Sequence, residues 1–211
     1  MLQWDAIYKR GPKAYKYYDL LHPHEDMPRI AAFLKARKAR RVLDLGCGSG
    51  RNFFYLDRFG FDVAGIDIAS AGIRAIRKRL KRTDARVGDI YKPLPYPHAS
   101  FDAVISVQVL QHSTAPSIKR AIQEMHRILR PGGVIFVTVG GRISKGKVRF
   151  CLVQTARRIA PNTYVPTDGG EKGLTHFIYN QKLLREHFKG FRTLGLWKDS
   201  KDYYCLLAQR R

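Results

Sequence analysis

The stretch from Arg41 to Arg51, RVLDLGCGSGR, decides the fold of this chain. It begins with a short apolar run, continues with glycines at positions 46, 48 and 50, and leads into an apolar segment at Phe53. This order is typical of a buried strand, a tight turn and the start of a helix. Glycine tolerates a positive φ and lets a ligand approach the backbone without meeting a Cβ. Because the first N–H groups of a helix lack partners, the turn predicts a nucleotide-sized site, with Asp44 as an anionic lip beside it.

Apolar runs that suit buried strands alternate with amphipathic helical segments through the middle of the chain. The five strands are expected at 42–45, 63–66, 85–87, 101–107 and 134–139. A helix that starts at Pro116 precedes the last of them, and it stops at the breaker Arg130-Pro131-Gly132-Gly133. The alternation predicts an α/β fold, a Rossmann-like, doubly wound sheet in a three-layer α/β/α arrangement.

Three acids stand at the ends of successive strands: Asp44, Asp67 and Asp89. Ligands of a doubly wound sheet bind at the carboxyl ends of its strands, so we expect these acids to rim one crevice. Asp67 is placed to accept hydrogen bonds from ribose hydroxyls, and Asp89 from an exocyclic amine. A nicotinamide enzyme would have G-x-G-x-x-G, whereas the third glycine here comes one residue early. An acid before the turn favours a cationic ligand, such as one with a sulfonium and an α-amino group.

Five ordered motifs resemble those of class I S-adenosylmethionine-dependent methyltransferases of the type 11/25-like superfamily. They are VLDLGCGSG at 42–50, GID at 65–67, GDI at 88–90, FDAVIS with VLQH within 101–112, and LRPGG at 129–133. The resemblance covers about residues 41–140. It implies a seven-stranded sheet whose last strand is antiparallel, with S-adenosyl-L-methionine as the cofactor and S-adenosyl-L-homocysteine as its product.

The same resemblance implies which residues hold the cofactor. The glycine turn would wrap the methionine portion, Asp67 would bind the ribose, and Asp89 with Ile90 would hold the adenine. The main chain near Ser106 and Val107 would meet the amino-acid end. The full implied set is Asp44, Gly46, Cys47, Gly48, Gly50, Asp67, Ile68, Asp89, Ile90, Ser106 and Val107.

Methyl transfer from a sulfonium is an in-line displacement, in which the protein mainly positions the nucleophile and excludes water. A base is needed only where the acceptor must lose a proton. The candidate catalytic residues are His112, His176 and Tyr18. His112 follows the fourth strand and should face the crevice, and Tyr18 is a possible pocket lid together with Tyr8. Ordinary packing is the alternative role for each of them.

Outside the core, the chain divides into an N-terminal helical arm at 1–40 and an insertion at 141–175, and then a C-terminal helix and strands at 176–211. We expect one domain, with the cofactor-binding core at 41–140. A helix is expected over roughly 147–159, with a flexible loop after it, and Asn180 suits the cap of the last helix. The insertion is a candidate acceptor lid, because such insertions lie over the ligand crevice; an inert surface excursion is the alternative.

The composition is strongly basic, with 39 Lys and Arg against 17 Asp and Glu and a formal net charge of +22. Such a charge attracts polyanions, and the candidate RNA contacts are Arg74–Arg82 and Arg142–Arg158. Solvated helix faces are the alternative. The three cysteines are far apart and lack CxxC spacing, so neither a disulfide framework nor a zinc site is predicted. The absence of a long apolar run and of a signal-peptide pattern predicts a cytoplasmic location.

Three hypotheses on function stay open: a methyltransferase that acts on a small molecule, the same chemistry on RNA, and a non-catalytic nucleotide- or RNA-binding module. The tail 177–188 and Arg51-Asn52 are similar to tellurite-resistance-type methyltransferases, and the region 88–133 is similar to tRNA wobble-uridine methyltransferases. Ser106-Val107-Gln108-Val109 stands where amino-group nucleic-acid methyltransferases carry Asn-Pro-Pro-Tyr. The absence of a Cys there argues against a cysteine-nucleophile enzyme.

Overall fold

A computed structural model describes residues 2–9, 19–144, 147–148 and 155–211 of the chain. Its centre is a seven-stranded sheet with the order β11-β12-β5-β4-β1-β2-β3. The strands are β1 (Arg41–Leu45), β2 (Asp62–Asp67), β3 (Asp84–Val87), β4 (Phe101–Val107), β5 (Leu129–Val139), β11 (Phe191–Lys198) and β12 (Tyr204–Arg210). The pairs formed by β1 to β5 are parallel, and β12 runs antiparallel to both β5 and β11. The predicted seven-stranded α/β sheet with an antiparallel last strand is confirmed.

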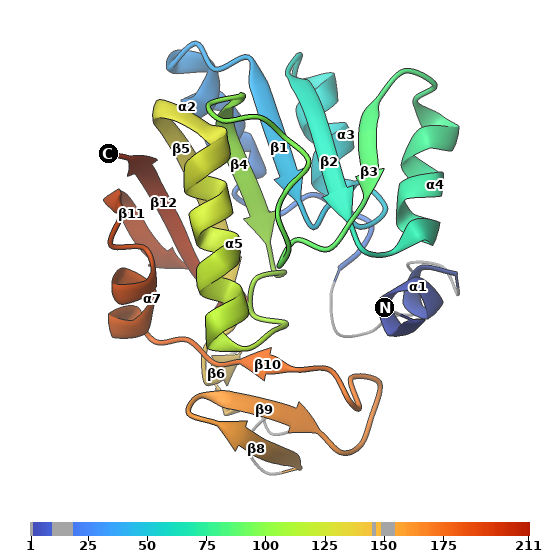
Figure 1. Cartoon of the computed structure of the whole chain (residues 1–211), viewed down its shortest axis with the longest axis vertical. Helices are drawn as coiled ribbons and strands as arrows, with labels where there is room; N and C mark the ends of the chain where they lie inside the picture. Colours follow the sequence, from blue (N-terminus) through green and yellow to red (C-terminus); the bar gives the residue numbers. More distant parts are fainter. Residues whose placement is uncertain (1, 10–18, 145–146, 149–154) are drawn as a thin grey trace.

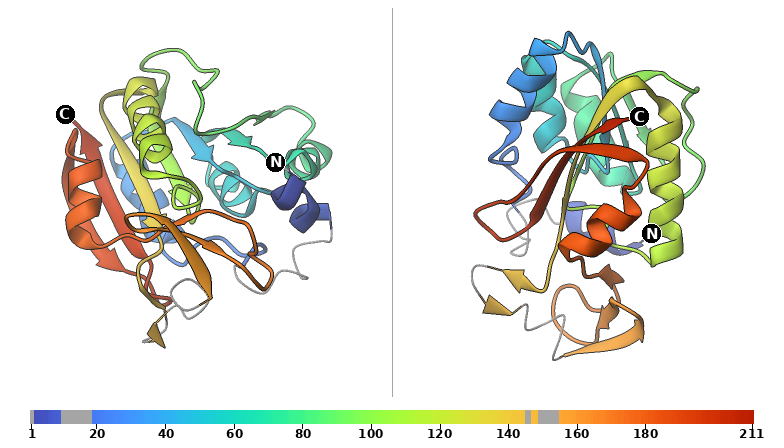
Figure 2. Two further views of the ribbon diagram at one scale, coloured as in Figure 1. Left: turned by 60° about the horizontal axis from the view of Figure 1, so that its bottom comes forward. Right: turned by 90° about the vertical axis from the view of Figure 1, so that its left-hand side faces the viewer.

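Helices cover both faces of this sheet (Figures 1 and 2). They are α2 (Met27–Ala36), α3 (Arg51–Arg58) and α4 (Ser70–Arg79) on one face, and α5 (Ala115–Ile128) and α7 (Gln181–His187) on the other. α5 shows why the layers hold together: Ile118, Ile122 and Met125 recur at helical spacing and are buried against the sheet. Burying each such side chain stabilises the fold by about 1.5–3 kcal/mol. The Asn180 side chain accepts a hydrogen bond from Leu183 N, so the predicted cap of α7 is confirmed.

The glycine turn between β1 and α3 lies where the order of the strands reverses, because β1 has β4 on one side and β2 on the other. Gly46, Gly48 and Gly50 all have positive φ, at 82°, 54° and 95°. A Cβ at Gly46 would lie 2.5 Å from a methyl carbon of Val109. The turn therefore needs glycine both for its backbone conformation and for the close approach of the chain that follows β4.

The insertion forms a small antiparallel sheet beyond the carboxyl edge of the main sheet (Figure 1). Its strands are β8 (Ala156–Ala160), β9 (Thr163–Pro166) and β10 (His176–Phe177), and the short pair β6 (Ile143–Ser144) and β7 (Lys147–Val148) precedes them. The helix expected over 147–159 is wrong in the described part of that range. Ala160 pairs with Thr163 across Pro161-Asn162, and Asn162 has a φ of 56°, so a tight hairpin forms in its place.

The N-terminal segment contributes two separate helices. α1 (Leu2–Lys9) lies beside the start of α4, at the carboxyl edge of the sheet (Figure 1). α2 belongs to the helix layer, where Met27, Ile30 and Leu34 are buried. Within the described residues, no helix is both long enough and apolar enough to cross a bilayer.

Candidate functional site

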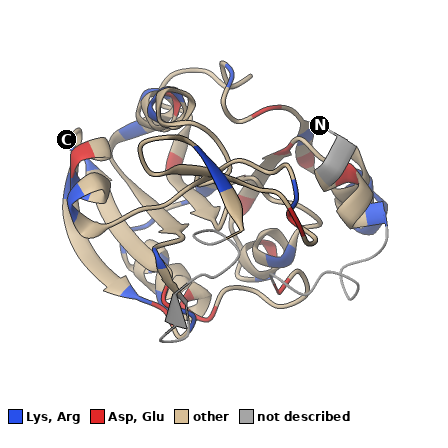
Figure 3. Cartoon of the chain, turned by 90° about the horizontal axis from the view of Figure 1, so that it is seen from below, with Lys and Arg blue, Asp and Glu red and all other residues tan. Residues whose placement is uncertain are grey.

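A cavity of about 280 Å³ opens at the carboxyl ends of β1, β2 and β4. Eight of the residues predicted for the site line it: Gly46, Cys47, Asp67, Ile68, Asp89, Ile90, Val107 and His112. Asp44, Gly48, Gly50, Ser106 and His176 are not among its lining residues. Tyr18 lies outside the described residues. Figure 3 views the molecule from this edge.

Asp44 lies beneath the glycine turn rather than beside it, with 1% of its surface exposed. The expectation of an anionic lip at the surface is therefore corrected to a buried carboxylate. Its Oδ2 atom has no hydrogen-bond partner among the described residues. Burial raises the pKa of Asp44 to about 7, although the nearby Arg51 guanidinium acts in the opposite direction. A buried carboxylate with an open oxygen suits a cationic group bound above the turn.

Asp67 holds the turn in shape. Its Oδ2 accepts a hydrogen bond of 2.8 Å from Gly48 N, and its Oδ1 accepts one of 2.8 Å from Ala69 N. Burial raises its pKa, while these backbone N–H groups lower it. Each carboxylate oxygen can accept more than one hydrogen bond, so Asp67 still has acceptor sites for a ligand hydroxyl.

The opposite wall of the cavity begins after β3. Asp89 Oδ1 accepts a hydrogen bond from Tyr91 N, and Ile90 turns an apolar side chain inward with 5% of its surface exposed. The Tyr91 hydroxyl donates to the carbonyl of Val109, which fixes the segment after β4 against this wall. An apolar side chain between two polar groups can pack against the face of a planar ring, while the polar groups form hydrogen bonds with the edge of that ring.

Arg51 and Gln108 are lining residues that the sequence reasoning did not select. Arg51 donates to Gln108 Oε1 at 2.9 Å and also to the carbonyl of Asp19. Gln108 has a φ of 61°, a conformation unusual for a residue with a side chain, and its N–H is held by Thr138. Burial lowers the pKa of the Arg51 guanidinium. The sequence shows that Arg51 follows the third glycine directly, but it does not show that this side chain is buried.

Helix α1 roofs the cavity, and Trp4 and Tyr8 line it from above. Asp5 attaches this helix to α4, because its Oδ1 accepts hydrogen bonds from Ser70 Oγ and Ala71 N at 2.9 and 2.8 Å. It thus caps a helix whose own N-cap residue, Ala69, has no capping side chain. A Cβ at Gly48 would clash with the Tyr8 hydroxyl, so the roof rests directly on the turn.

Two histidines lie one behind the other at the inner end of the cavity. The ring of His112 packs edge-on against Trp4 at 4.9 Å and against His176 at 4.8 Å between centroids. His176 is 2% exposed, and its Nε2 lies 3.8 Å from Oε2 of the buried Glu171. The sequence prediction placed both histidines at one pocket; the structure brings them together, with His112 at the cavity and His176 behind it.

A separate buried cluster joins His24, Asp199 and Cys205, with donor atoms within 4.8 Å of one another. His24 Nε2 and Asp199 Oδ2 are 3.1 Å apart, while His24 Nδ1 accepts a hydrogen bond from Asp26 N. Asp199 Oδ1 accepts from two backbone N–H groups of the β11–β12 turn. These hydrogen bonds connect the segment before α2 to that turn, so the cluster has a structural role.

Residues 43–137 match the family described as methyltransferase domain. The chain is 35% identical over 133 residues to tRNA (carboxymethyluridine(34)-5-O)-methyltransferase of Arabidopsis thaliana, covering 59% of this chain and 32% of the relative. It is 34% identical over 133 residues to malonyl-[acyl-carrier protein] O-methyltransferase of Enterobacter lignolyticus, covering 63% and 51%. The chain thus spans about a third to a half of the length of these two relatives.

Among solved structures, Burkholderia thailandensis 1,6-didemethyltoxoflavin-N1-methyltransferase with bound S-adenosylhomocysteine has a TM-score of 0.69 at 18% identity, covering 99% of this chain and 87% of that one. The [4+2]-cyclase SpnF has a TM-score of 0.68 at 19% identity, covering 99% and 94%. These likenesses show the fold. The family match adds that residues 43–137 are similar to methyltransferase domains.

Proposed function

We propose that the chain transfers a methyl group from S-adenosyl-L-methionine to an O, N or S nucleophile of a small-molecule acceptor. The observation that carries this proposal is the roofed cavity, in which the glycine turn and His112 line the same space beneath Trp4 and Tyr8. A roof made by a docked helix suits an acceptor that is enclosed, whereas a polymer would have to insert one residue into the cavity. The acceptor would reach the cavity on the side of Leu174 and Ser113.

The residues of the cavity fit this cofactor. The open Oδ2 of Asp44 suits the charge of a sulfonium or an α-amino group above the turn. Asp67 offers its remaining acceptor sites to ribose hydroxyls, and Ile90 with Asp89 receives the adenine. Arg51 would anchor the carboxylate of the methionine portion, because it is the buried cation nearest the end of the turn and a guanidinium binds carboxylates well. Ser106 supports the site indirectly, since its hydroxyl donates to the carbonyl of Leu45.

The bound cofactor supplies an activated methyl group on a positively charged sulfur. This chain's residues would orient the acceptor, exclude water and remove a proton where the acceptor is protic. His112 is the proposed base, because its ring lines the cavity. His176 packs behind the His112 ring and would hold its orientation, with Glu171 beside His176. Tyr18 stays a candidate lid residue from the sequence alone.

RNA is the second candidate acceptor. A relative that is 35% identical over 133 residues acts on tRNA by its name, and β8, beyond the carboxyl edge of the main sheet, carries the exposed Arg157 and Arg158. The other predicted patch, Arg74–Arg82, follows α4 away from the cavity, so most of it could hold RNA but could not deliver a nucleotide to His112. A non-catalytic module that binds the cofactor without turnover is the third possibility, and the cyclase with this fold is a reason to test turnover directly.

The test is incubation with S-adenosylmethionine labelled at the methyl group, with a metabolite extract and with total RNA in parallel. Label in a small molecule supports the proposal, and label in RNA supports the second candidate. Cofactor binding by calorimetry without label transfer to either extract would favour the non-catalytic module. His112→Ala serves as the matched variant: it should bind the cofactor normally and lose turnover.

A further inference from the structure

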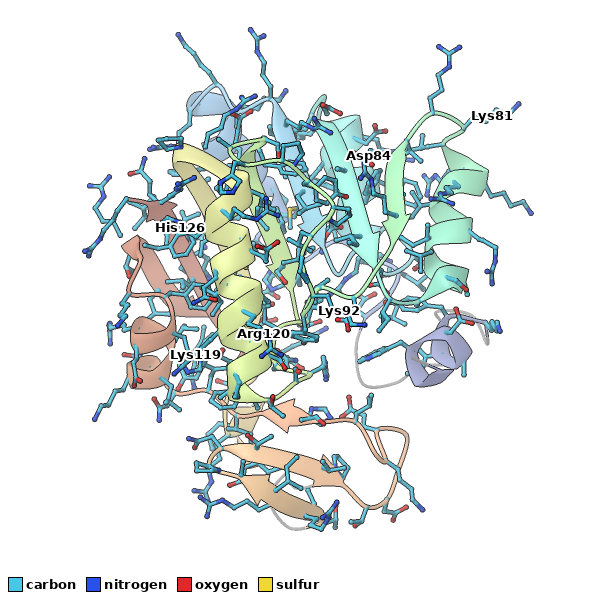
Figure 4. All side chains as sticks on the ribbon, in the orientation of Figure 1. Lys81, Asp84, Lys92, Lys119, Arg120 and His126 are labelled. Carbon is cyan, nitrogen blue, oxygen red and sulfur yellow. The ribbon has the colours of Figure 1, made fainter. Side chains whose placement is uncertain are left out.

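The edge of the sheet opposite the cavity carries a concentration of cations. Lys35, Arg37, Lys38, Arg40 and Arg41 occupy the end of α2 and the turn into β1, a run without an acid. A second run, at 77–82, occupies the end of α4 and the turn into β3 and has five Lys or Arg and no acid. Figure 4 shows Lys81 of this run at the upper right of the molecule, whereas Lys119 and Arg120 lie on the lower half of α5.

The two runs form one continuous surface. Arg41 Nη2 lies 3.1 Å from Asp84 Oδ2, which joins the start of β1 to the start of β3 across the start of β2. Arg58 and the exposed Phe59 stand between the runs, at the turn into β2. We call the surface formed by residues 35–41, 58–59 and 77–82 the basic edge.

Four acids lie at or beside the basic edge. Asp84 pairs with Arg41 and Arg86, Asp62 with Arg41, and Asp102 with Arg130, while Asp57 is exposed directly before Arg58. Arg40, Lys81 and Arg82 are exposed and have no acidic partner among the described residues. The cations of this surface therefore outnumber the acids around them in the described part of the chain.

Helix ends explain only part of this charge. Cations in the last turn of a helix interact favourably with its dipole, which accounts for Lys35 and for Arg79. The effect falls off within that turn, so it does not account for Arg40 or for Lys81 and Arg82, which lie beyond the helices. Bringing like charges together without such a gain costs folding free energy, and a bound external anion would offset this cost.

Two further features match a nucleic-acid strand. Phe59 is 40% exposed and stacks on two other rings. Its ring centroid lies 5.8 Å from that of Tyr55, with an interplanar angle of 19°, and 6.3 Å from that of Phe61, with an interplanar angle of 12°. A ring exposed beside cations is how single strands are held without sequence reading. A hollow of about 190 Å³ is also lined by Arg37 and Lys38, together with Arg130 and its ion-pair partner Asp102. Arg37 and Lys38 have no acidic partner among the described residues, so they can contact a phosphate.

We propose that the basic edge is a docking surface for single-stranded nucleic acid, separate from the methyl-transfer cavity. The phosphates contact Arg40, Lys81 and Arg82, and a base stacks on Phe59. The surface tethers the protein to a polyanion and leaves the cavity, at the other edge, open to its acceptor. An anionic membrane is the less suitable partner, because Phe59 is the one large exposed apolar side chain recorded on this described surface, and surface-bound proteins insert a broad apolar face.

The test measures binding of a fluorescent 20-nucleotide RNA, and of a DNA of the same sequence, as a function of salt. The edge variant is Arg40→Glu/Lys81→Glu/Arg82→Glu. The control variant, Lys119→Glu/Lys182→Glu/Arg185→Glu, makes the same charge change at exposed residues of α5 and α7. We expect the edge variant to bind at least about tenfold more weakly at low salt and to lose about 2 from the slope of log K against log salt, since each contact to a single strand contributes about 0.7.

Phe59→Ala should weaken binding about fivefold or more without changing the salt slope, because stacking is not a counterion effect. Far-UV circular dichroism and the dissociation constant for the cofactor establish that each variant is folded. The proposal is overturned if RNA and DNA do not bind at low salt, or if the control variant loses as much affinity as the edge variant. Binding to vesicles that contain phosphatidylserine is measured in parallel. The proposal is also overturned if the edge variant loses only this binding and keeps its affinity for RNA and DNA. A result for methyl transfer does not decide it, because the two sites are separate.

Discussion

Asp44 is the residue of the first motif that we propose to meet the charge of the cofactor. Its carboxylate is buried below the turn, with Arg51 and Asp67 as the nearest charged groups that influence it. Its pKa is about 7 in the folded protein and about 4 in an unfolded chain. The folded protein therefore holds an extra proton between these values, and its free energy of unfolding falls as the pH rises from about 4 to 7.

This shift predicts a pH dependence of cofactor binding. A cation bound above Asp44 favours its ionised form, so binding releases a proton, and affinity should rise by up to about tenfold per pH unit from about pH 5 to 7 before it levels off. Calorimetry in buffers of different ionisation enthalpy measures the proton release directly. Asp44→Asn should bind more weakly and lose the pH dependence. A wild-type affinity that is flat between pH 5 and 8 would show that the carboxylate does not meet a cation.

The histidine pair predicts a second effect at the scale of residues. If His112 accepts a proton from the acceptor, His112→Ala should lower kcat by about 10²- to 10⁴-fold while cofactor affinity stays the same. Glu171→Gln removes the carboxylate beside His176 and should lower kcat by less than His112→Ala does, because it acts through the position of the His112 ring. Glu171→Asp, which keeps a carboxylate, should lose less kcat than Glu171→Gln. A Glu171→Gln enzyme with an unchanged kcat would assign Glu171 to packing.

At the scale of elements, α1 forms the roof of the cavity. Asp5 fixes it to α4, and the hydrogen bonds from Ala71, Lys9 and Ser70 hold the pKa of Asp5 well below its usual range. The contact joins residues 66 positions apart. It places Trp4 and Tyr8 over the cavity, so the strength of this one contact should set how readily the roof opens.

Asp5→Ala should therefore weaken cofactor binding about fivefold, mainly through faster dissociation, because it removes the acceptor that attaches α1 to α4. Stopped-flow fluorescence of Trp4 follows the roof. Lys9→Ala is the matched control, because its ion pair with Asp5 is exposed and contributes little. Equal dissociation rates for Asp5→Ala and the wild type would mean that other contacts hold the roof.

The sequence predicted elements well where local and long-range signals agreed. The glycine turn, the strands that end at Asp67 and near Asp89, and the cap at Asn180 were all visible as local patterns. The β8–β9 hairpin was missed because apolar residues over 147–159 also fit a helix, and the positive φ of Asn162 decided against it. The roof and the burial of Arg51 depend on contacts between distant segments, which no local pattern records.

At the scale of the whole molecule, the cavity brings together segments that are far apart in the sequence. Residues from α1, the glycine turn, the end of β2 and the segments after β3 and β4 all line it. A ligand that contacts all of them binds the folded state and not the unfolded chain, so it shifts the unfolding equilibrium of the entire domain. The size of that shift reports whether these segments act as one site.

The cofactor or its product at 100 times its dissociation constant should stabilise the protein by about 2.7 kcal/mol and raise Tm by about 5–10 °C in a domain of this size. Differential scanning calorimetry at several ligand concentrations measures the shift. Asp67→Ala removes the acceptor that also holds Gly48 N, so at the same ligand concentration it should lose most of the shift. Adenosine alone should give a smaller shift at equal concentration, because it leaves Asp44 and Arg51 without their charged partners. If adenosine stabilises the protein as much as the whole cofactor, the methionine end of the site makes no contribution, and the roles assigned to Asp44 and Arg51 are wrong.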